Sequence, residues 1–144
     1  NNYGNLITLK NLEYILNEAR DQCSKTLKEH KIIHMLIDNY LVDEKKYSHL
    51  PKNCKCDHIS LDISFICLPI KFVSIIEEKI KRYHISIDRI ISCGYVENFF
   101  QNENLNLISM AEKINDGCNN NEVILSEKKS INNGFFEKFF QFFS

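Results

Sequence analysis

The chain has 144 residues and a mass of 17.0 kDa, and its 18 basic and 19 acidic residues give a formal net charge of −1 at pH 7. With 44% hydrophobic and 26% charged residues, the composition is that of a globular protein, and it excludes collagen-like and disordered chains. The even charge balance argues against an electrostatic nucleic-acid binder, which carries a marked basic excess. Four glycines leave little support for a glycine-loop nucleotide site.

The first predicted element is a helix from Thr8 to about Gln22. Its apolar residues recur at steps of three and four, which places them on one helical face: Leu9, Leu12, Leu16, Ala19 and Cys23. Thr8 is the expected N-cap, because its hydroxyl can accept a hydrogen bond from the first helical turn.

Two strands are expected next, with a polar connection from Asp43 to Asp57 between them. Ile32–Val42 is rich in β-branched and large apolar residues and is too short for a buried helix. Ile59–Cys67 alternates apolar and polar residues, which predicts a strand with one buried and one polar face.

A second helix is predicted from Pro69 to about Tyr83, since proline is favoured at the first helical position. Its inner stripe is expected to be Phe72, Val73, Ile76, Ile80 and Tyr83. A last strand, Ser86–Cys93, ends at Gly94. This order of elements, helix-strand-strand-helix-strand, predicts an α+β fold, a two-layer sandwich of about 95 residues.

The character of the chain changes after Phe100. Residues 101–130 are rich in Asn, Glu and Lys with short apolar islands, which is typical of a polar linker. One marginal helix is expected within it, around Leu105 to Ile114.

The segment 131–144 predicts a short amphipathic helix. At 100° per residue, six of the ten phenylalanines fall within an arc of roughly 160°. Glu137, Lys138, Gln141 and Ser144 fill the opposite side. The phenylalanines and the lysine beside them are the candidate membrane-binding residues: Phe135, Phe136, Lys138, Phe139, Phe140, Phe142 and Phe143.

Two interpretations of this segment compete on the residues alone. A terminal apolar stripe can dock onto its own domain. It can also lie in the plane of a membrane with its aromatic side chains at the boundary of headgroups and acyl chains. The polar face lacks a basic excess, because Lys138 is balanced by Glu137.

Other constellations carry weaker signals. His49, Cys54, Cys56 and His58 are possible zinc ligands, but the C-x-C spacing is tighter than in common structural sites, and chance clustering is the preferred interpretation. His30 and His34 share no face of the predicted strand, so they are not expected to form a catalytic pair. The six cysteines are expected to be free thiols. No nucleophile or phosphate-loop motif is present, and the chain is predicted not to be an enzyme.

The blocks "ITLKNLEYIL", "HKIIHMLIDNYLVD", "ISLDISFICL", "KRYHISID" and "RIISCGYV" arrive in an order that resembles the SHS2 subdomain of the bacterial cell-division protein FtsA. The resemblance covers about Ile7 to Phe100. FtsA-like proteins also end in a linker and an amphipathic helix, and "NGFFEKFFQFF" stands at that place. The resemblance therefore implies an SHS2-like domain over residues 1–100, a linker over 101–130 and a membrane-targeting helix over 131–144.

The resemblance implies a divisome component on the cytoplasmic face of the inner membrane, peripherally bound. Its expected partners are other division proteins, a second copy of itself and membrane lipid. No cofactor is expected, because the ATP-binding subdomains of the family, with loops such as D-I-G-G-G-T, have no counterpart here. The resemblance therefore implies a truncated form of the family. Contact with FtsZ stays open, because the family's FtsZ-binding surface lies in the actin-like part, which has no counterpart here. The alternative is an SHS2-like interaction module whose aromatic tail binds a partner protein as a helix rather than lipid.

Overall fold

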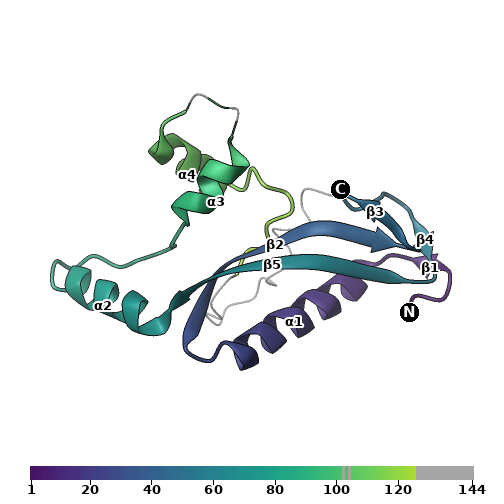
Figure 1. Cartoon of the computed structure of the whole chain (residues 1–144), viewed down its shortest axis with the longest axis horizontal. Coiled ribbons are helices and arrows are strands. Elements are labelled where there is room, and N and C mark those ends of the chain that lie inside the picture. The colour runs from purple at the N-terminus through teal and green to yellow at the C-terminus, as the bar shows by residue number, and fades with distance from the viewer. Residues whose placement is uncertain (102, 104, 126–144) are drawn as a thin grey trace.

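A long antiparallel pair of strands organises the computed structural model, which describes residues 1–101, 103 and 105–125. The two strands are β2 (His30–Val42) and β5 (Ile59–Pro69), and β3 (Lys45–Tyr47) continues the sheet in the order β3-β2-β5. A second sheet pairs β1 (Asn5–Leu6) with β4 (Lys55–Cys56) at one end of the long strands (Figure 1). Four helices complete the described residues: α1 (Leu9–Thr26), α2 (Ile70–Lys81), α3 (Cys93–Phe99) and α4 (Leu107–Asn115). The predicted α+β class is confirmed.

Helix α1 begins where the sequence predicts and runs one turn further. Thr8 is its N-cap, and a capping box forms because Asn11 N–H donates to Thr8 Oγ1 while Thr8 N–H donates to Asn11 Oδ1. Leu12 and Leu16, four residues apart, are each 1% exposed. The apolar stripe read from the sequence is thus the face that α1 buries against the sheet.

Both predicted central strands form, and a tight turn connects the first of them to β3. Asp43 and Glu44 have φ values of 45° and 67°, as a two-residue hairpin turn of type I′ requires. The Asp43 side chain holds the neighbouring loop, because its Oδ1 accepts hydrogen bonds from the backbone N–H groups of Asp57 and His58, both at 2.9 Å.

The β2–β5 pair is covered on both faces, which differs from the predicted two-layer sandwich. On one face Met35 and Ile37 pack with Leu16 of α1. On the other face Leu36 and its neighbour Ile66 pack against α3 and α4. Figure 1 shows α1 below the strands and the α3–α4 pair above them. Apolar residues occur at consecutive positions along β2, so each face of the strand needs its own cover.

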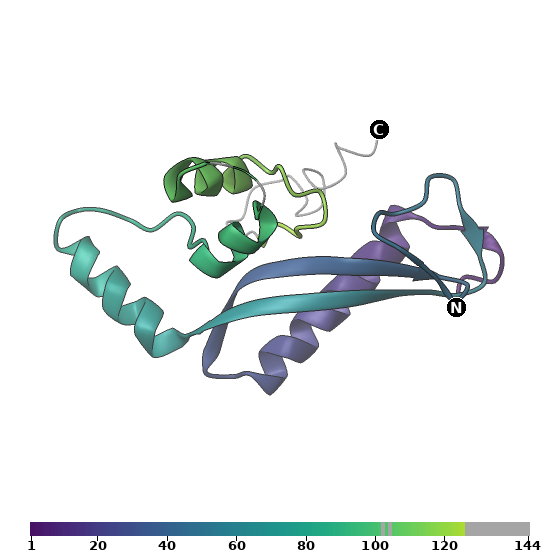
Figure 2. The same ribbon diagram turned by 45° about the horizontal axis from the view of Figure 1, so that its top comes forward.

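Helix α2 lies beyond the end of the strand pair (Figures 1 and 2), and Val73 is its one buried residue. Pro69 is its N-cap rather than its first residue, and the helix ends at Lys81, two residues before the predicted end. Val73 is buried as predicted, but Phe72 and Tyr83 are 51% and 75% exposed. The predicted inner stripe is therefore only partly an inner face.

The predicted strand Ser86–Cys93 is wrong. Residues 86–92 form no regular element, and Cys93 and Gly94 begin helix α3. The segment is held by side chains instead of a strand ladder, because Arg89 bonds to Glu122 and the Ser92 N–H donates to His34. These contacts draw it across the face of the sheet rather than along an edge.

The expectation of a polar linker over 101–130 does not hold for residues 105–125. The predicted helix there is α4, whose Ile114 is fully buried. Residues 121–123 then run beside the edge of β2, with Ile37 N–H donating to Asn121 O at 2.8 Å and Val123 N–H donating to Met35 O at 2.9 Å. Val123 is 2% exposed within the core around Leu16. This stretch is part of the folded domain.

Candidate functional site

The most polar buried position in the described residues is Glu122, whose side chain is 5% exposed. It follows the short pairing of residues 121–123 with β2, which turns its carboxylate toward the α3 side of the sheet. Oε1 accepts from Arg89 Nη2 at 2.5 Å and lies 2.7 Å from His34 Nδ1, and Oε2 accepts from the Tyr95 hydroxyl at 3.0 Å. Three segments far apart in the sequence therefore meet at one carboxylate.

The neighbours of His34 define its tautomer. Nε2 accepts a hydrogen bond from the Ser92 N–H at 2.9 Å, so it carries no proton. The proton of the neutral imidazole is then on Nδ1, from which it is donated to Glu122. His34 is fully buried and its ring lies 4.7 Å from that of Tyr95. Both ring nitrogens are in use, which leaves none free to act as a general base.

The surroundings of Glu122 favour its ionised form. Burial raises the pKa of the carboxyl, but the hydrogen bond from His34 and the positive charge of Arg89 outweigh it and hold the pKa of Glu122 below its usual value. Burial also raises the pKa of Tyr95, so its hydroxyl stays protonated and donates. Asn119 Nδ2 in turn donates to this hydroxyl at 2.8 Å.

This Glu122 cluster, made of His34, Arg89, Tyr95, Asn119 and Glu122, acts as a structural clamp. It joins β2, the 86–92 segment, α3 and the chain after α4. Arg89 extends it to the end of α4 through a 3.4 Å contact from Nη1 to the Ile114 carbonyl oxygen. No buried side-chain nitrogen or oxygen among the described residues lacks a hydrogen-bond partner, so the cluster is fully satisfied.

The clamp predicts a pH dependence of folding stability. Because the pKa of Glu122 is lower in the folded chain than in the unfolded one, its contribution is present above the unfolded value, about 4.3, and is lost as the pH falls through the folded value. Urea unfolding between pH 7 and pH 3 is expected to show wild type losing its advantage over Glu122→Gln as the pH falls. A gap between the two that stays constant down to pH 3 would contradict the ionised clamp.

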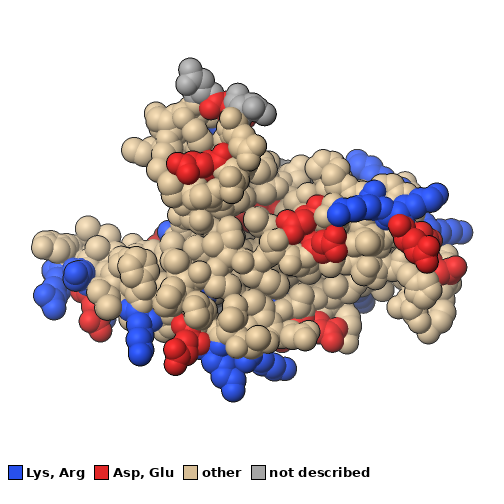
Figure 3. Space-filling model, viewed as in Figure 1, with Lys and Arg blue, Asp and Glu red and all other residues tan. Residues whose placement is uncertain are grey.

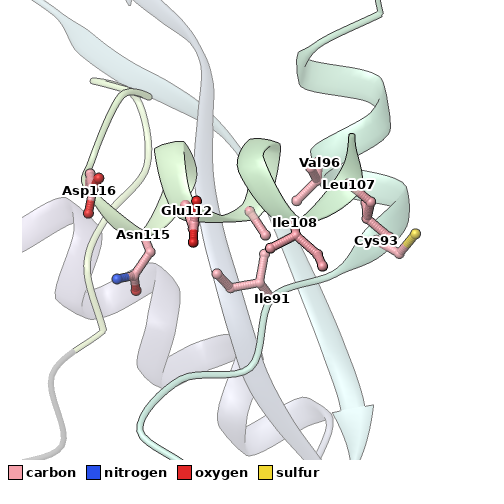
Figure 4. A pocket seen from close by; sticks show the side chains of 9 residues that line it. Ile91, Cys93, Val96, Leu107, Ile108, Glu112, Asn115 and Asp116 are labelled. Atoms are coloured by element: carbon pink, nitrogen blue, oxygen red, sulfur yellow. The ribbon is translucent and has the colours of Figure 1, made fainter. Parts of the chain in front are cut away.

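A groove opens on the outer side of α3 and α4, with a volume of about 660 Å³ (Figure 4). One end is apolar and is lined by Ile91, Cys93, Val96, Leu107, Ile108 and Ala111. The other end is polar, and Glu112, Asn115 and Asp116 line it. Ile108 is 74% exposed, so a large apolar side chain faces solvent at the mouth. An open apolar site of this size with acidic residues at one end suits an amphipathic segment better than a small polar ligand.

The four residues of the possible zinc cluster do not come together. Cys56 is buried and accepts a hydrogen bond from Asn2 Nδ2, whereas His49 and His58 are exposed. Within residues 1–101, 103 and 105–125, no group of three or more His, Cys, Asp or Glu side chains is arranged to hold a metal ion. All six cysteines are free in the structure.

The candidate membrane-binding residues lie outside the described residues, and so does the rest of segment 131–144. Among the helices that the structure describes, none has the length and apolarity to cross a bilayer.

Sequence reasoning missed the Glu122 cluster and the groove. Two residues could have indicated the cluster. His34 interrupts the apolar run of β2, and Glu122 directly precedes the apolar Val123, so each of them would need a polar partner if it were buried. Nothing in the sequence pairs the two, since 88 residues separate them.

Comparisons with known proteins identify no relative of this chain. No family model matches the chain, and no curated protein and no solved structure shows significant similarity to it.

Proposed function

We propose that this chain is a cell-division protein similar to FtsA. In this proposal residues 131–144 hold it on the cytoplasmic face of the bacterial inner membrane, and the folded domain makes protein contacts at the division septum. The observation that carries the proposal is the order of elements at the start of the chain: a short strand, a helix, two long paired strands with two short strands between them, and a helix. The first three sequence blocks that resemble the SHS2 subdomain of FtsA fall on α1, β2 and β5 in the same order, and the fourth, "KRYHISID", begins at the last residue of α2.

The exposed side of α2 supports a role in protein contacts. Ile70, Phe72 and Ile75 are 44%, 51% and 53% exposed on this helix, which projects from the rest of the fold. Large apolar side chains grouped on one projecting element are typical of a protein interaction surface. Basic side chains of the same helix, Lys79 and Lys81, stand in its last turn.

The phenylalanine pattern of residues 135–144 supports membrane attachment. Full burial of one aromatic side chain is worth about 1.5–3 kcal/mol, and a membrane interface realises part of it for each of six. One such helix binds modestly. Copies linked at a septum gain retention, because the second attachment is intramolecular.

One element departs from the proposed likeness. The block "RIISCGYV" would be a strand in the family's order, but here it divides between the irregular 86–92 segment and helix α3. The proposal therefore rests on the blocks before it and on the tail.

Imaging in dividing cells tests the septal part of the proposal. A fluorescent protein fused to the N-terminus of the full chain, expressed in a rod-shaped bacterium, is expected to give a band at midcell. The same fusion to a chain ending at Ser130 is expected to spread through the cytoplasm. An even distribution of the full chain would contradict the septal role.

The second candidate is an interaction module of the same fold whose tail binds a partner protein as a helix. The exposed apolar face of α2 would serve this role equally well. The two candidates differ in lipid dependence, since a helix that binds a partner ignores vesicles and a membrane anchor responds to them.

A further inference from the structure

The groove on α3 and α4 has no occupant among the described residues, and it offers apolar surface beside negative charge. Between Cys93 and Asp116 the chain has four acidic residues, Glu97, Glu103, Glu112 and Asp116, and one basic residue, Lys113. Lys113 is paired with Glu103 at 2.9 Å. Figure 3 shows that the charged atoms visible over the α3–α4 pair are mainly acidic.

The chain supplies a segment of matching chemistry. Residues 126–144 contain three lysines, Lys128, Lys129 and Lys138, against two glutamates, and they contain the six phenylalanines. An acidic apolar groove and a weakly basic aromatic segment are complementary in both charge and polarity.

The length of the connection permits this contact within one molecule. Ten residue steps separate Leu125, the last described residue, from Phe135. An extended chain of that length spans up to about 33 Å. Glu122, three residues before Leu125, is joined through Arg89 to the Ile114 carbonyl oxygen, next to Asn115 of the groove. The phenylalanines can therefore reach the groove without strain on the folded part.

We propose that the groove formed by the 86–92 segment, α3 and α4 binds the chain's own residues 135–144 when no lipid is present. The apolar end, with Ile91, Val96 and Ile108, receives phenylalanine side chains, and Glu112 and Asp116 lie beside Lys138. The consequence for regulation rests on the proposed membrane function: groove and bilayer compete for the same six phenylalanines. The domain then keeps its aromatic segment shielded until a membrane takes it over.

Photo-crosslinking of the full chain tests the contact without any lipid. With p-benzoylphenylalanine in place of Phe139, irradiation is expected to join the tail to groove residues of the same molecule, as mapped by peptide mass spectrometry. The same probe in place of Gln141, on the polar side of the tail, is the matched control and should crosslink several-fold less. Ile108→Glu should lower the Phe139-probe yield about fivefold or more, and Tyr14→Glu, at an exposed position of α1, should leave it unchanged.

Crosslinks between two chains, or crosslinks that avoid the groove, would overturn the proposal. Both results are independent of vesicles, so they separate this inference from the proposed membrane role. If the intramolecular crosslink forms but the wild-type chain never binds vesicles of phosphatidylglycerol and phosphatidylethanolamine, groove docking stands and the membrane role fails.

The competition between groove and bilayer is measured by the apparent affinity of the chain for vesicles. If about nine in ten molecules hold the tail in the groove, releasing it raises the apparent affinity for vesicles about tenfold. Ile108→Glu is therefore expected to bind such vesicles more tightly than wild type, and Tyr14→Glu to bind as wild type does. Equal binding by Ile108→Glu and wild type would overturn the competition.

Discussion

Replacing Glu122 with alanine is expected to destabilise the folded chain by about 2–4 kcal/mol. The change removes the acceptor for His34, Arg89 and Tyr95 together and leaves the His34 ring buried without one of its two partners. The estimate is at the lower end of what breaking a buried ion pair costs, because the Arg89 side chain is 27% exposed and can reach water. Urea unfolding followed by circular dichroism measures the effect.

A matched control for this change is Glu18→Ala on α1. Glu18 is exposed, so removing its carboxylate should alter the free energy of unfolding by no more than about 0.5 kcal/mol. Tyr95→Phe with Glu122→Ala should cost less than the sum of the two single changes, since both remove the same hydrogen bond. A loss below about 0.5 kcal/mol for Glu122→Ala would contradict the clamp.

Phe139→Glu together with Phe143→Glu is expected to weaken binding to anionic vesicles about a hundredfold. Each change removes an aromatic side chain from the centre of the phenylalanine arc, and a loss of about 1.4 kcal/mol at each of two positions multiplies to that factor. Gln141→Glu with Ser144→Glu adds the same two negative charges on the polar side. This control should bind nearly as wild type does if apolar contact dominates.

Vesicle flotation over a range of lipid concentrations measures both variants. Equal binding by the Phe139→Glu, Phe143→Glu variant and wild type would contradict the anchor. Equal weakening by both variants would assign the binding to charge instead of the phenylalanines.

Local sequence patterns predicted the elements whose conformation depends on their own residues rather than on distant contacts. Helix α1 was predictable because its apolar stripe and its N-cap Thr8 agree, and β5 because Ile59 to Cys67 alternate. The chain from Ser86 to Ile91 has the composition of a strand, yet its conformation is decided by contacts with distant residues: Arg89 bonds to Glu122, and the adjoining Ser92 N–H donates to His34. Such long-range contacts leave no periodic signal in the segment itself.

The folded state of residues 105–125 was hidden for a similar reason. Their composition is polar, but two of their few apolar residues, Ile114 and Val123, are buried in the core. The average composition of residues 101–130 is polar, and this average conceals a short folded stretch. In that stretch the buried Glu122 directly precedes the core residue Val123. The sequence-level view of residues 131–144 remains a prediction, because they lie outside the described residues.

Co-sedimentation of the purified full chain with anionic vesicles, beside a chain ending at Ser130, is the most direct test of membrane attachment through residues 131–144. The described fold ends at Leu125, so the shorter chain keeps every contact of the Glu122 cluster and serves as a folded control. We expect the full chain to pellet with the vesicles and the shorter chain to stay in solution. If neither pellets, residues 131–144 are not a membrane anchor and the proposed FtsA-like attachment fails.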